Sequence, residues 1–416
     1  MERGERVRAQ GQMEERIGHD DGPTMQRALQ ALGIQAEYRT ASPTHACLAL
    51  SGGRLLLLPL VSRRAFTDGW DLYWPGSVLG RVARRFARTA AYPVARGLVW
   101  RGLRLHGTGD TDVSVKLKQA HRLLHGKEPI LAIYAGTPGP ERKLVIRVPR
   151  YERTGAVYLK LAFTRTAAEL VRREFDALND LTQMSLTTAV VPQPLFAEET
   201  HHCYALATSG MERRVPMSIS RRLLSFLLEL AQASEQKECF GESSFYRMLR
   251  AHATVACAIL PARFAKVITL ATTKLGDVLG SHILPMPPSV GDFSPWNVGL
   301  DRSTGKLSIV DLEYYQRRSI PGWDLFHYGL NAGAIRIRRA GIELGSMRHL
   351  INEYLAALGI EPGIIGLLLP ALLLAYQVRL LTEQLSRWAS YAHVLPVERL
   401  WSAFRKVETL RELMSV

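Results

Sequence analysis

The chain has 416 residues, of which 47% are hydrophobic and 22% are charged, a composition that excludes a globally disordered protein. A single core rarely organises so long a chain, so we expect two or three lobes or domains. Lysine and arginine number 53 against 38 aspartates and glutamates, and the formal net charge of +15 favours polyanionic partners such as nucleotides, phosphorylated sugars, nucleic acid or anionic lipid without choosing among them.

The first residues of the chain and its cysteines indicate the cellular compartment. The first residues, MERGERVRAQGQMEERIGHDDGP, are polar and carry no apolar secretory core, so we predict a disordered leader over 1–24. The cysteines form no CxxC pair and predict neither a zinc site nor a disulfide framework; they are Cys47, Cys203, Cys239 and Cys257. A reducing, cytoplasmic location fits this pattern best.

Residues 25–128 are predicted to form an N-terminal α/β accessory region, in which apolar strand-like segments precede a long basic stretch. In this stretch, 78–104, Pro93 is expected to break or kink a helix. Five apolar residues lie near helical spacing among seven arginines: Val82, Phe86, Val94, Leu98 and Leu103 among Arg81, Arg84, Arg85, Arg88, Arg96, Arg101 and Arg104.

Two interpretations of the basic stretch stay open. It is either an amphipathic helix that lies on an anionic membrane or binds an anionic acceptor, or a helix packed on the neighbouring lobe with solvated arginines. No RNA-binding aromatic motif accompanies the arginines, so specific nucleic-acid binding is not expected.

Residues 129–211 are predicted to form a small, β-rich lobe. The segment ILAIYAGTPGPERKLVIRV is typical of two strands joined by a turn, in which Gly136 and Gly139 would let the backbone approach a phosphate; an ordinary β-hairpin would show the same pattern. A third strand, AVYLKLAF, carries Lys160, and an amphipathic helix after it carries Glu174.

Residues 212–416 are predicted to form a larger helical lobe, interrupted over 284–313 by a Pro-rich loop and short strands. The longest apolar run, 363–376, contains Pro370 and is shorter than the roughly 20 residues that a membrane-spanning helix needs, so it predicts a buried core helix.

The interruption carries a pattern that suits phosphoryl transfer. In SVGDFSPWNVGLDRSTGKLSIVDLEYY, an aspartate is followed five residues later by an asparagine, and an apolar strand then ends at a second aspartate. The reaction needs a carboxylate that accepts the proton of the attacking hydroxyl, and oxygen ligands that hold Mg²⁺ on the nucleotide phosphates. Asp292 fits the first role, and Asn297 and Asp311 fit the second.

GDFSPWN, followed by VDLEYY and then by GWDL, resembles the aminoglycoside phosphotransferase and choline kinase-like family. The resemblance implies a two-lobed α+β protein kinase-like fold, Mg²⁺, and ATP or GTP as phosphoryl donor. One position departs from the family pattern: Val290 stands where the family usually has a histidine that braces the loop.

The resemblance also implies roles outside the hairpin. Lys160 would hold the α- and β-phosphates and Glu174 would hold that lysine, while the backbone of 207–211 would bind adenine. A solvated glutamate and an edge-strand lysine are the alternatives, with Arg147 as the rival cation. Asp324 would support the catalytic loop from behind, or would cap the helix that follows it.

The acceptor is not readable from the motifs. The strongly basic chain favours a neutral or anionic hydroxyl compound, such as a sugar, a saccharide or an amino alcohol derivative, over a polycationic antibiotic. A catalytically weak kinase-like protein that binds and regulates a partner is the competing hypothesis. No A-P-E segment follows Asp311, so transfer to protein side chains is disfavoured.

Overall fold

The computed structural model forms two compact units, one of residues 1–180 and 192–212 and the other of 181–191 and 213–416. The structure describes residues 34–38, 44–50, 53–73, 78–97, 102–107, 111–115, 130–149, 156–200, 203–211, 213–214, 220–234, 236–301, 304–332, 336–337, 342–343 and 345–389. The predicted polar leader, 1–24, lies outside the described residues.

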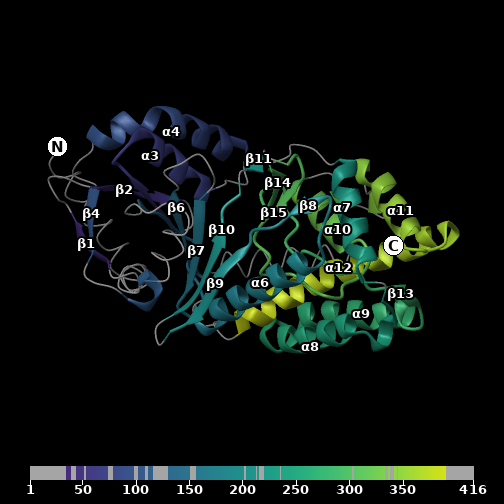
Figure 1. Cartoon of the computed structure of the whole chain (residues 1–416). Helices are drawn as coiled ribbons and strands as arrows, with labels where there is room; N and C mark the ends of the chain where they lie inside the picture. Colours follow the sequence, from purple (N-terminus) through teal and green to yellow (C-terminus); the bar gives the residue numbers. More distant parts are fainter. Residues whose placement is uncertain are drawn as a thin grey trace. The chain divides into compact units, whose positions relative to one another are not determined.

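The first unit is built on a nine-stranded antiparallel sheet (Figure 1). In spatial order its strands are β1 (Ile34–Tyr38), β4 (Gly102–Gly107), β2 (His45–Leu50), β3 (Arg54–Pro59), β5 (Ala132–Ala135), β6 (Lys143–Pro149), β7 (Ala156–Ala162), β10 (Tyr204–Ser209) and β9 (Pro194–Glu199).

Side chains of the central strands β6 and β7 alternate between the two faces of the sheet. On β6 and β7 every second side chain is fully buried in one apolar cluster, which contains Leu144, Ile146, Val148, Val157, Leu159 and Leu161. Side chains between these positions, among them Lys160, point to the opposite face, because successive strand residues alternate in direction. Helix α6 (Arg165–Gln183) follows β7 and carries Glu174, which lies within hydrogen-bond distance of Lys160.

The predicted accessory region and the predicted small lobe share this sheet. Strand β3 pairs with β5 through Leu55–Ala135, Leu56–Tyr134 and Leu57–Ile133. The apolar run LLLL of β3 is buried on both faces, which is why it showed no alternation in the sequence. The α/β extension is therefore continuous with the lobe that carries Lys160.

The basic stretch forms helix α4 (Val78–Gly97), which continues through Pro93. Of the two expected effects of Pro93, the break is wrong and the kink stays a prediction. The apolar residues Val82 and Phe86 are not the ones that pack against the first unit. Phe86 and Val82 are 71% and 63% exposed, whereas Tyr92 packs on Phe66 of α3 (Arg63–Gly69) and its hydroxyl donates to the Leu60 carbonyl.

Two of the arginines of α4 bind within the first unit. Arg84 and Arg88 reach Asp71 at 3.2 and 2.9 Å, and Arg84 also donates to the Trp70 carbonyl. These contacts, rather than the Val82–Phe86 stripe, set which face of α4 is turned inward. The side chains of Arg81, Val94, Arg96, Leu98, Arg101 and Leu103 lie outside the described residues.

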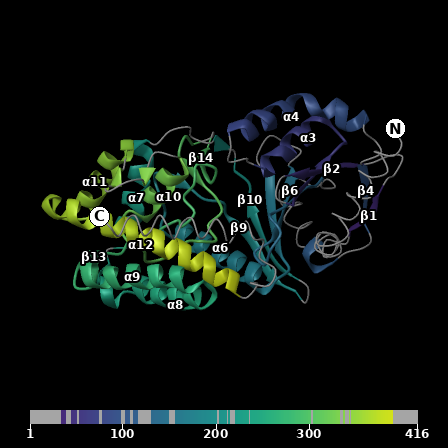
Figure 2. The ribbon, with the colours of Figure 1, turned by 180° about the vertical axis from the view of Figure 1, so that it is seen from behind.

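The second unit is mainly helical. Its principal helices are α7 (Arg221–Gln232), α8 (Ser244–Ile259), α9 (Ala262–Leu279), α10 (Trp323–Asn331), α11 (Arg348–Ala357) and α12 (Pro362–Ala389). Figure 2 shows α12 running beside α8 and α9. A small sheet of order β11 (Arg213–Arg214), β14 (Val298–Asp301), β15 (Leu307–Ile309) and β8 (Ala189–Val190) holds the predicted hairpin.

The remaining strands of the second unit form two short antiparallel pairs, β12 (Lys237–Cys239) with β13 (Ile283–Pro285) and β16 (Arg336–Ile337) with β17 (Ile342–Glu343). The α+β class, with a β-rich first lobe and a helical second lobe, is confirmed.

Helix α12 includes the longest apolar run. By length and composition alone, residues 362–386 could cross a membrane, at a mean hydropathy of 2.0, but 67% of the most apolar window is buried in the structure. Tyr376, Arg379 and Leu385 are each at most 2% exposed. This burial agrees with the predicted core helix.

Candidate active site

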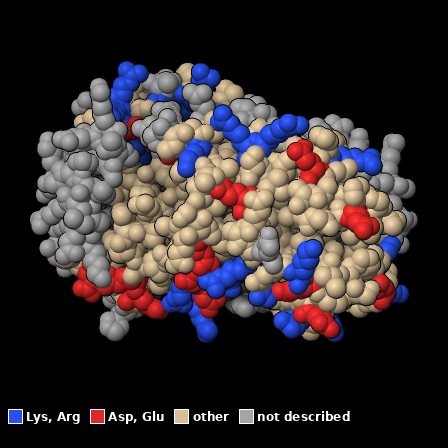
Figure 3. Space-filling model, turned by 45° about the vertical axis from the view of Figure 1, so that its right-hand side comes forward, with Lys and Arg blue, Asp and Glu red and all other residues tan. Residues whose placement is uncertain are grey.

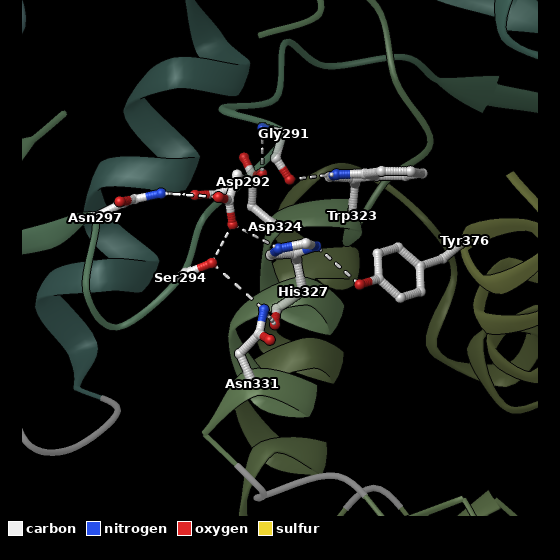
Figure 4. Close-up of polar contacts among 9 residues, drawn as sticks. All are labelled: Gly291, Asp292, Ser294, Asn297, Trp323, Asp324, His327, Asn331 and Tyr376. Carbon is white, nitrogen blue, oxygen red and sulfur yellow. Dashed lines mark hydrogen bonds and ion pairs between the residues drawn. The ribbon is translucent and has the colours of Figure 1, made fainter. Parts of the chain in front are cut away.

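The loop before Asp292 is fixed by the start of α10. The Asp324 carboxylate accepts the backbone N–H groups of Val290 and Gly291 at 2.8 and 3.1 Å, and the Trp323 indole donates to the Gly291 carbonyl at 3.0 Å (Figure 4). Val290 is fully buried. In this chain the loop is therefore braced by Asp324 and Trp323, with an apolar side chain at the position where the family usually has a histidine.

The backbone conformation and the close packing at position 291 require glycine. Its φ of +87° is a conformation that residues with a side chain rarely adopt, and a Cβ atom there would lie 2.0 Å from the Tyr314 carbonyl oxygen. The sharp turn at Gly291 brings the loop close to the segment after Asp311 and presents the next residue, Asp292, beyond it.

Asp324 supports the loop and does not cap its helix. The N-cap of α10 is Gly322, so the capping interpretation of Asp324 is wrong. The carboxylate is buried, and burial raises its pKa to about 6 in spite of the hydrogen bonds from Val290 and Gly291, which lower it.

The Asp292 carboxylate is held at both oxygens. The Asn297 amide donates to Oδ2 at 3.0 Å and to the Asp292 backbone carbonyl at 3.1 Å. The Ser294 hydroxyl donates to Oδ1, and Nε2 of His327 lies 2.9 Å from the same oxygen. The side chain remains 25% exposed. A carboxylate fixed in this way and still open to solvent can accept a proton from a bound hydroxyl.

The contact between Asn297 and Asp292 determines the orientation of the Asn297 side-chain amide. Because a carboxylate only accepts hydrogen bonds, the NH₂ group must face Asp292, and the amide oxygen then points away from it. That oxygen is the kind of ligand that Mg²⁺ prefers.

Asp311 lies at the same end of the hairpin as Asn297. Strands β14 and β15 pair Val298 with Ile309, and the Val310 N–H donates to the Asn297 carbonyl at 3.0 Å. Asp311 follows Val310 directly and has a φ of +64°. This backbone conformation is rare for a residue with a side chain and costs about 1–3 kcal/mol of conformational free energy. A carboxylate and an amide oxygen are ligand types that a hard divalent cation prefers. The metal-binding role of Asn297 and Asp311 stays a prediction.

The first unit holds the second group of predicted residues. Lys160 Nζ lies 2.8 and 2.6 Å from the two carboxylate oxygens of Glu174, and the two side chains are 14% and 5% exposed. Neither is a solvated surface charge. Arg147, the rival cation, instead lies 3.8 Å from Asp68. The role of the Lys160–Glu174 pair toward phosphates stays a prediction.

The turn between β5 and β6 contains both predicted glycines. Gly139 has a φ of +143°, and its carbonyl accepts the Arg142 N–H at 3.0 Å, while the Gly136 N–H donates to the Lys143 carbonyl at 3.3 Å. A Cβ atom at Gly136 would meet no atom closer than 3.7 Å, so sterics within the chain do not require glycine there. The phosphate role of this turn stays a prediction.

The segment predicted to bind adenine already uses several backbone groups. Strand β10 pairs on one side with β7 and on the other with β9. The N–H of Ser209 donates to the Gln193 carbonyl, and that of Gly210 to the Ala156 carbonyl. Adenine binding through this segment would have to use other groups.

Four residues of the hydrogen-bonded group around Asp292 were not predicted from the sequence: Ser294, His327, Asn331 and Tyr376. His327 lies one helical turn after Asp324 in GWDLFHY, and this i, i+3 spacing on a short helix was a usable signal. Tyr376 lies within the apolar run of α12, where no pattern distinguishes it from its neighbours.

No protein-family model matches the chain, and no curated protein sequence does. Solved structures are similar in fold. Wild-type aminoglycoside 2'-phosphotransferase-IIIa, in a GDP complex, is 13% identical, with 70% of this chain and 98% of that chain covered and a TM-score of 0.46. The amicoumacin kinase hAmiN, with AMP-PNP, Ca²⁺ and Ami, is 12% identical over 72% and 93%, with a TM-score of 0.45.

Spectinomycin phosphotransferase, with ADP and spectinomycin, is 11% identical over 73% of this chain and 98% of that chain, with a TM-score of 0.43. At these identities and TM-scores the likeness carries no inference about the reaction or the acceptor of this chain.

Proposed function

We propose that the chain is a phosphotransferase that moves the γ-phosphoryl group of ATP or GTP to a hydroxyl group of a small molecule. The observation that supports this most directly is the Asp292–Asn297 contact. It fixes the orientation of one carboxylate, which could then accept a proton, and it turns the amide oxygen of Asn297 away from that carboxylate, so that this oxygen could bind a metal ion. Phosphoryl transfer needs both groups within one loop.

In the proposed reaction, the acceptor oxygen bonds to the γ-phosphorus, the bond from that phosphorus to the β,γ-bridging oxygen breaks, and the hydroxyl proton passes to Asp292. Asn297 and Asp311 would hold Mg²⁺, which when bound offsets the negative charge of the phosphates. Lys160, kept in place by Glu174, would bind the α- and β-phosphates, with the Gly136–Gly139 turn beside them.

For the acceptor we propose a neutral or anionic hydroxyl compound, such as a sugar, a saccharide or an amino alcohol derivative. The net charge of +15 supports this choice over a polycationic antibiotic. The face shown in Figure 3 carries both basic and acidic side chains among the described residues. A screen of acceptors with labelled ATP tests the choice, and transfer confined to kanamycin-type compounds would overturn it.

The experiment that tests the enzyme itself is nucleotide binding by calorimetry, with and without Mg²⁺, followed by phosphate release. We expect Mg²⁺ to tighten binding in the wild type and to have little effect in Asp311→Ala. Asp301→Ala is a matched control, because Asp301 lies at the opposite end of the same hairpin. Absence of Mg²⁺-dependent binding in the wild type would refute the proposal.

The alternative is a kinase-like protein that binds a partner and has little turnover. The same measurements separate the two functions. Nucleotide binding without phosphate release or transfer to any acceptor, together with an unchanged result in Asp292→Asn, would favour the binding protein. The presence of Asp292, Asn297 and Asp311 together favours the enzyme.

A peripheral contact of 78–104 with an anionic membrane is a second proposal, favoured by one observation. Phe86 and Val82, one turn apart on α4, are 71% and 63% exposed, and the Arg85 side chain beside them is exposed. Flotation with vesicles of phosphatidylserine and phosphatidylcholine tests it. Phe86→Ser should weaken binding and Val61→Ser, on the loop before α3, should not; equal flotation of both variants would count against the contact.

A further inference from the structure

His327 has no role in the proposed reaction so far, although it touches Asp292. Its Nε2 lies 2.9 Å from Oδ1 of Asp292, and its Nδ1 lies 2.9 Å from the hydroxyl oxygen of Tyr376 (Figure 4). The His327 side chain is only 12% exposed. Three groups from three separate segments, the loop, α10 and α12, therefore form one hydrogen-bonded chain.

Asp292 and Tyr376, at the two ends of this hydrogen-bonded chain, determine which nitrogen of His327 carries a hydrogen. The Asp292 carboxylate only accepts, so Nε2 of His327 must carry a hydrogen. In the neutral ring Nδ1 is then an acceptor, and the Tyr376 hydroxyl donates to it. Tyr376 is 1% exposed and has no other hydrogen-bond partner among the described residues. A charged ring would leave its hydroxyl proton without an acceptor, at a cost of about 1–3 kcal/mol.

Tyr376 is a firm support for this arrangement. Its ring packs edge-on against Trp323 at 4.8 Å between centroids and lies 5.9 Å from Phe326. Trp323 in turn donates to the Gly291 carbonyl, next to Asp292. Burial raises the pKa of Tyr376 well above its usual range, so the hydroxyl keeps its proton at neutral pH.

The two oxygens of Asp292 are used unequally. Oδ1 accepts from both His327 and Ser294, whose hydroxyl is in turn approached by the Asn331 amide at 3.4 Å. Oδ2 accepts from Asn297 alone among the described residues. Oδ2 therefore retains more capacity to accept a proton than Oδ1 does.

We infer that His327, held in its Nε2–H form by Tyr376, is a positioning residue that occupies Oδ1 of Asp292 and leaves Oδ2 to take the acceptor's proton. The inference rests on the proposed function, because it assigns an orientation to the proposed base. It concerns turnover and not nucleotide binding, since neither His327 nor Tyr376 is a predicted nucleotide or metal ligand.

Two substitutions of His327 separate positioning from packing. His327→Gln keeps a nitrogen donor near the place of Nε2, whereas His327→Asn places its amide near Nδ1 and cannot reach Asp292. We expect kcat for phosphate release from the Mg²⁺–nucleotide complex to fall about 10- to 100-fold in His327→Asn and far less in His327→Gln, with KM for the nucleotide unchanged in both. Equal kcat in the two variants would overturn the inference.

Tyr376→Phe tests the other end of the chain. It removes the hydroxyl and keeps the ring against Trp323, so we expect a smaller loss of kcat in the same direction. Asp292→Asn is measured alongside. An active wild type, an inactive Asp292→Asn and unaltered His327 and Tyr376 variants would refute the positioning role while leaving the proposed function in place.

The proton arrangement has a readout that does not depend on turnover. In protein labelled with ¹⁵N-histidine, the His327 resonances, identified by their loss in His327→Gln, should show the neutral Nε2–H form and should shift in Tyr376→Phe. The Nδ1–H form or a charged ring at neutral pH would overturn the inference. If the wild type released no phosphate, the proposed function would fail and this spectrum would still decide the hydrogen-bonded arrangement.

Discussion

Lys160 Nζ lies 2.6 Å from the Glu174 carboxylate, and both side chains are nearly removed from solvent. A buried ion pair adds little net stability, because both charges have lost their hydration, but removing one partner takes away a charge that offsets the other in the interior. The pair therefore links the stability of the first unit to its predicted phosphate-binding function. One substitution of Glu174 tests the stability, and one substitution of Lys160 tests the nucleotide binding.

Glu174→Gln should destabilise the fold by about 3–5 kcal/mol, because it removes the carboxylate charge that lies 2.6 Å from the nearly buried Lys160 ammonium. Chemical denaturation of the wild type and the variant measures this. The control is Glu169→Gln, which breaks the exposed i, i+4 pair with Arg165 on the same helix and should cost at most about 1 kcal/mol. Equal effects would contradict the buried-pair assignment.

Lys160→Met removes the charge and keeps the length of the side chain. It should weaken nucleotide binding at least about tenfold, which calorimetry measures. Arg147→Met, on the neighbouring strand, serves as control. A loss of affinity in the control that matches Lys160→Met would return the phosphate role to Arg147.

Asp292→Asn should lower kcat about 10²- to 10⁴-fold while nucleotide affinity stays nearly constant, because the amide cannot accept the acceptor's proton. Steady-state phosphate release and calorimetry together measure the two effects. Asp301→Asn, in the same hairpin, should leave both unchanged. A large loss of nucleotide affinity in Asp292→Asn would show that Asp292 is a metal or phosphate ligand instead.

Gly291→Ala should destabilise the second unit by at least about 3 kcal/mol, because the new Cβ atom would meet the Tyr314 carbonyl in a left-handed backbone. Gly305→Ala is a matched control: Gly305 also has a positive φ, of +67°, but nothing lies within 4 Å of its Cβ position. That change should cost about 1–2 kcal/mol. Thermal or chemical unfolding that ranked the two variants in the opposite order would reject the close approach at Gly291.

Asp324 makes a testable contribution to the pH dependence of stability. Burial raises its folded pKa from 3.8 to about 6, so the folded state binds the proton more tightly than the unfolded state does. The resulting stabilisation is present below pH 4, is lost as pH rises through 6, and amounts to about 3 kcal/mol.

We therefore expect the free energy of unfolding of the wild type to fall more steeply between pH 4 and 7 than that of Asp324→Asn. Denaturation series at several pH values give the two slopes. A ¹³C titration of the Asp324 carboxyl, with a midpoint near 6, checks the same pKa without a variant. Parallel slopes together with a midpoint near 4 would contradict the shift.

The sequence predicted elements whose side chains alternate or recur regularly. The two strands Lys143–Pro149 and Ala156–Ala162, and the helix after them, were identified because apolar side chains recur along each at the spacing of a strand or a helix. The hairpin from Asp292 to Asp311 was predicted because phosphoryl transfer demands particular polar residues in a fixed order along one stretch of chain.

What sequence reasoning missed depends on tertiary contacts. Tyr376 is 49 residues from His327, and His327 is 35 residues from Asp292, so no local pattern joins them. On α4 the apolar spacing of Val82 and Phe86 could not show which side packs inward, because the inward side is set by ion pairs of Arg84 and Arg88 with Asp71 and by the packing of Tyr92.

The pairing of β3 with β5 has a practical consequence for anyone who trims the protein to its recognisable motifs. A shortened chain starting at residue 129 would bare the hydrogen-bonding edge of β5 and uncover the apolar surface that Leu55 and Leu57 protect. Such an open edge is a template for pairing with other chains. Expression trials that preserve β1 to β4 should give dispersed material, and those that remove them should give aggregates.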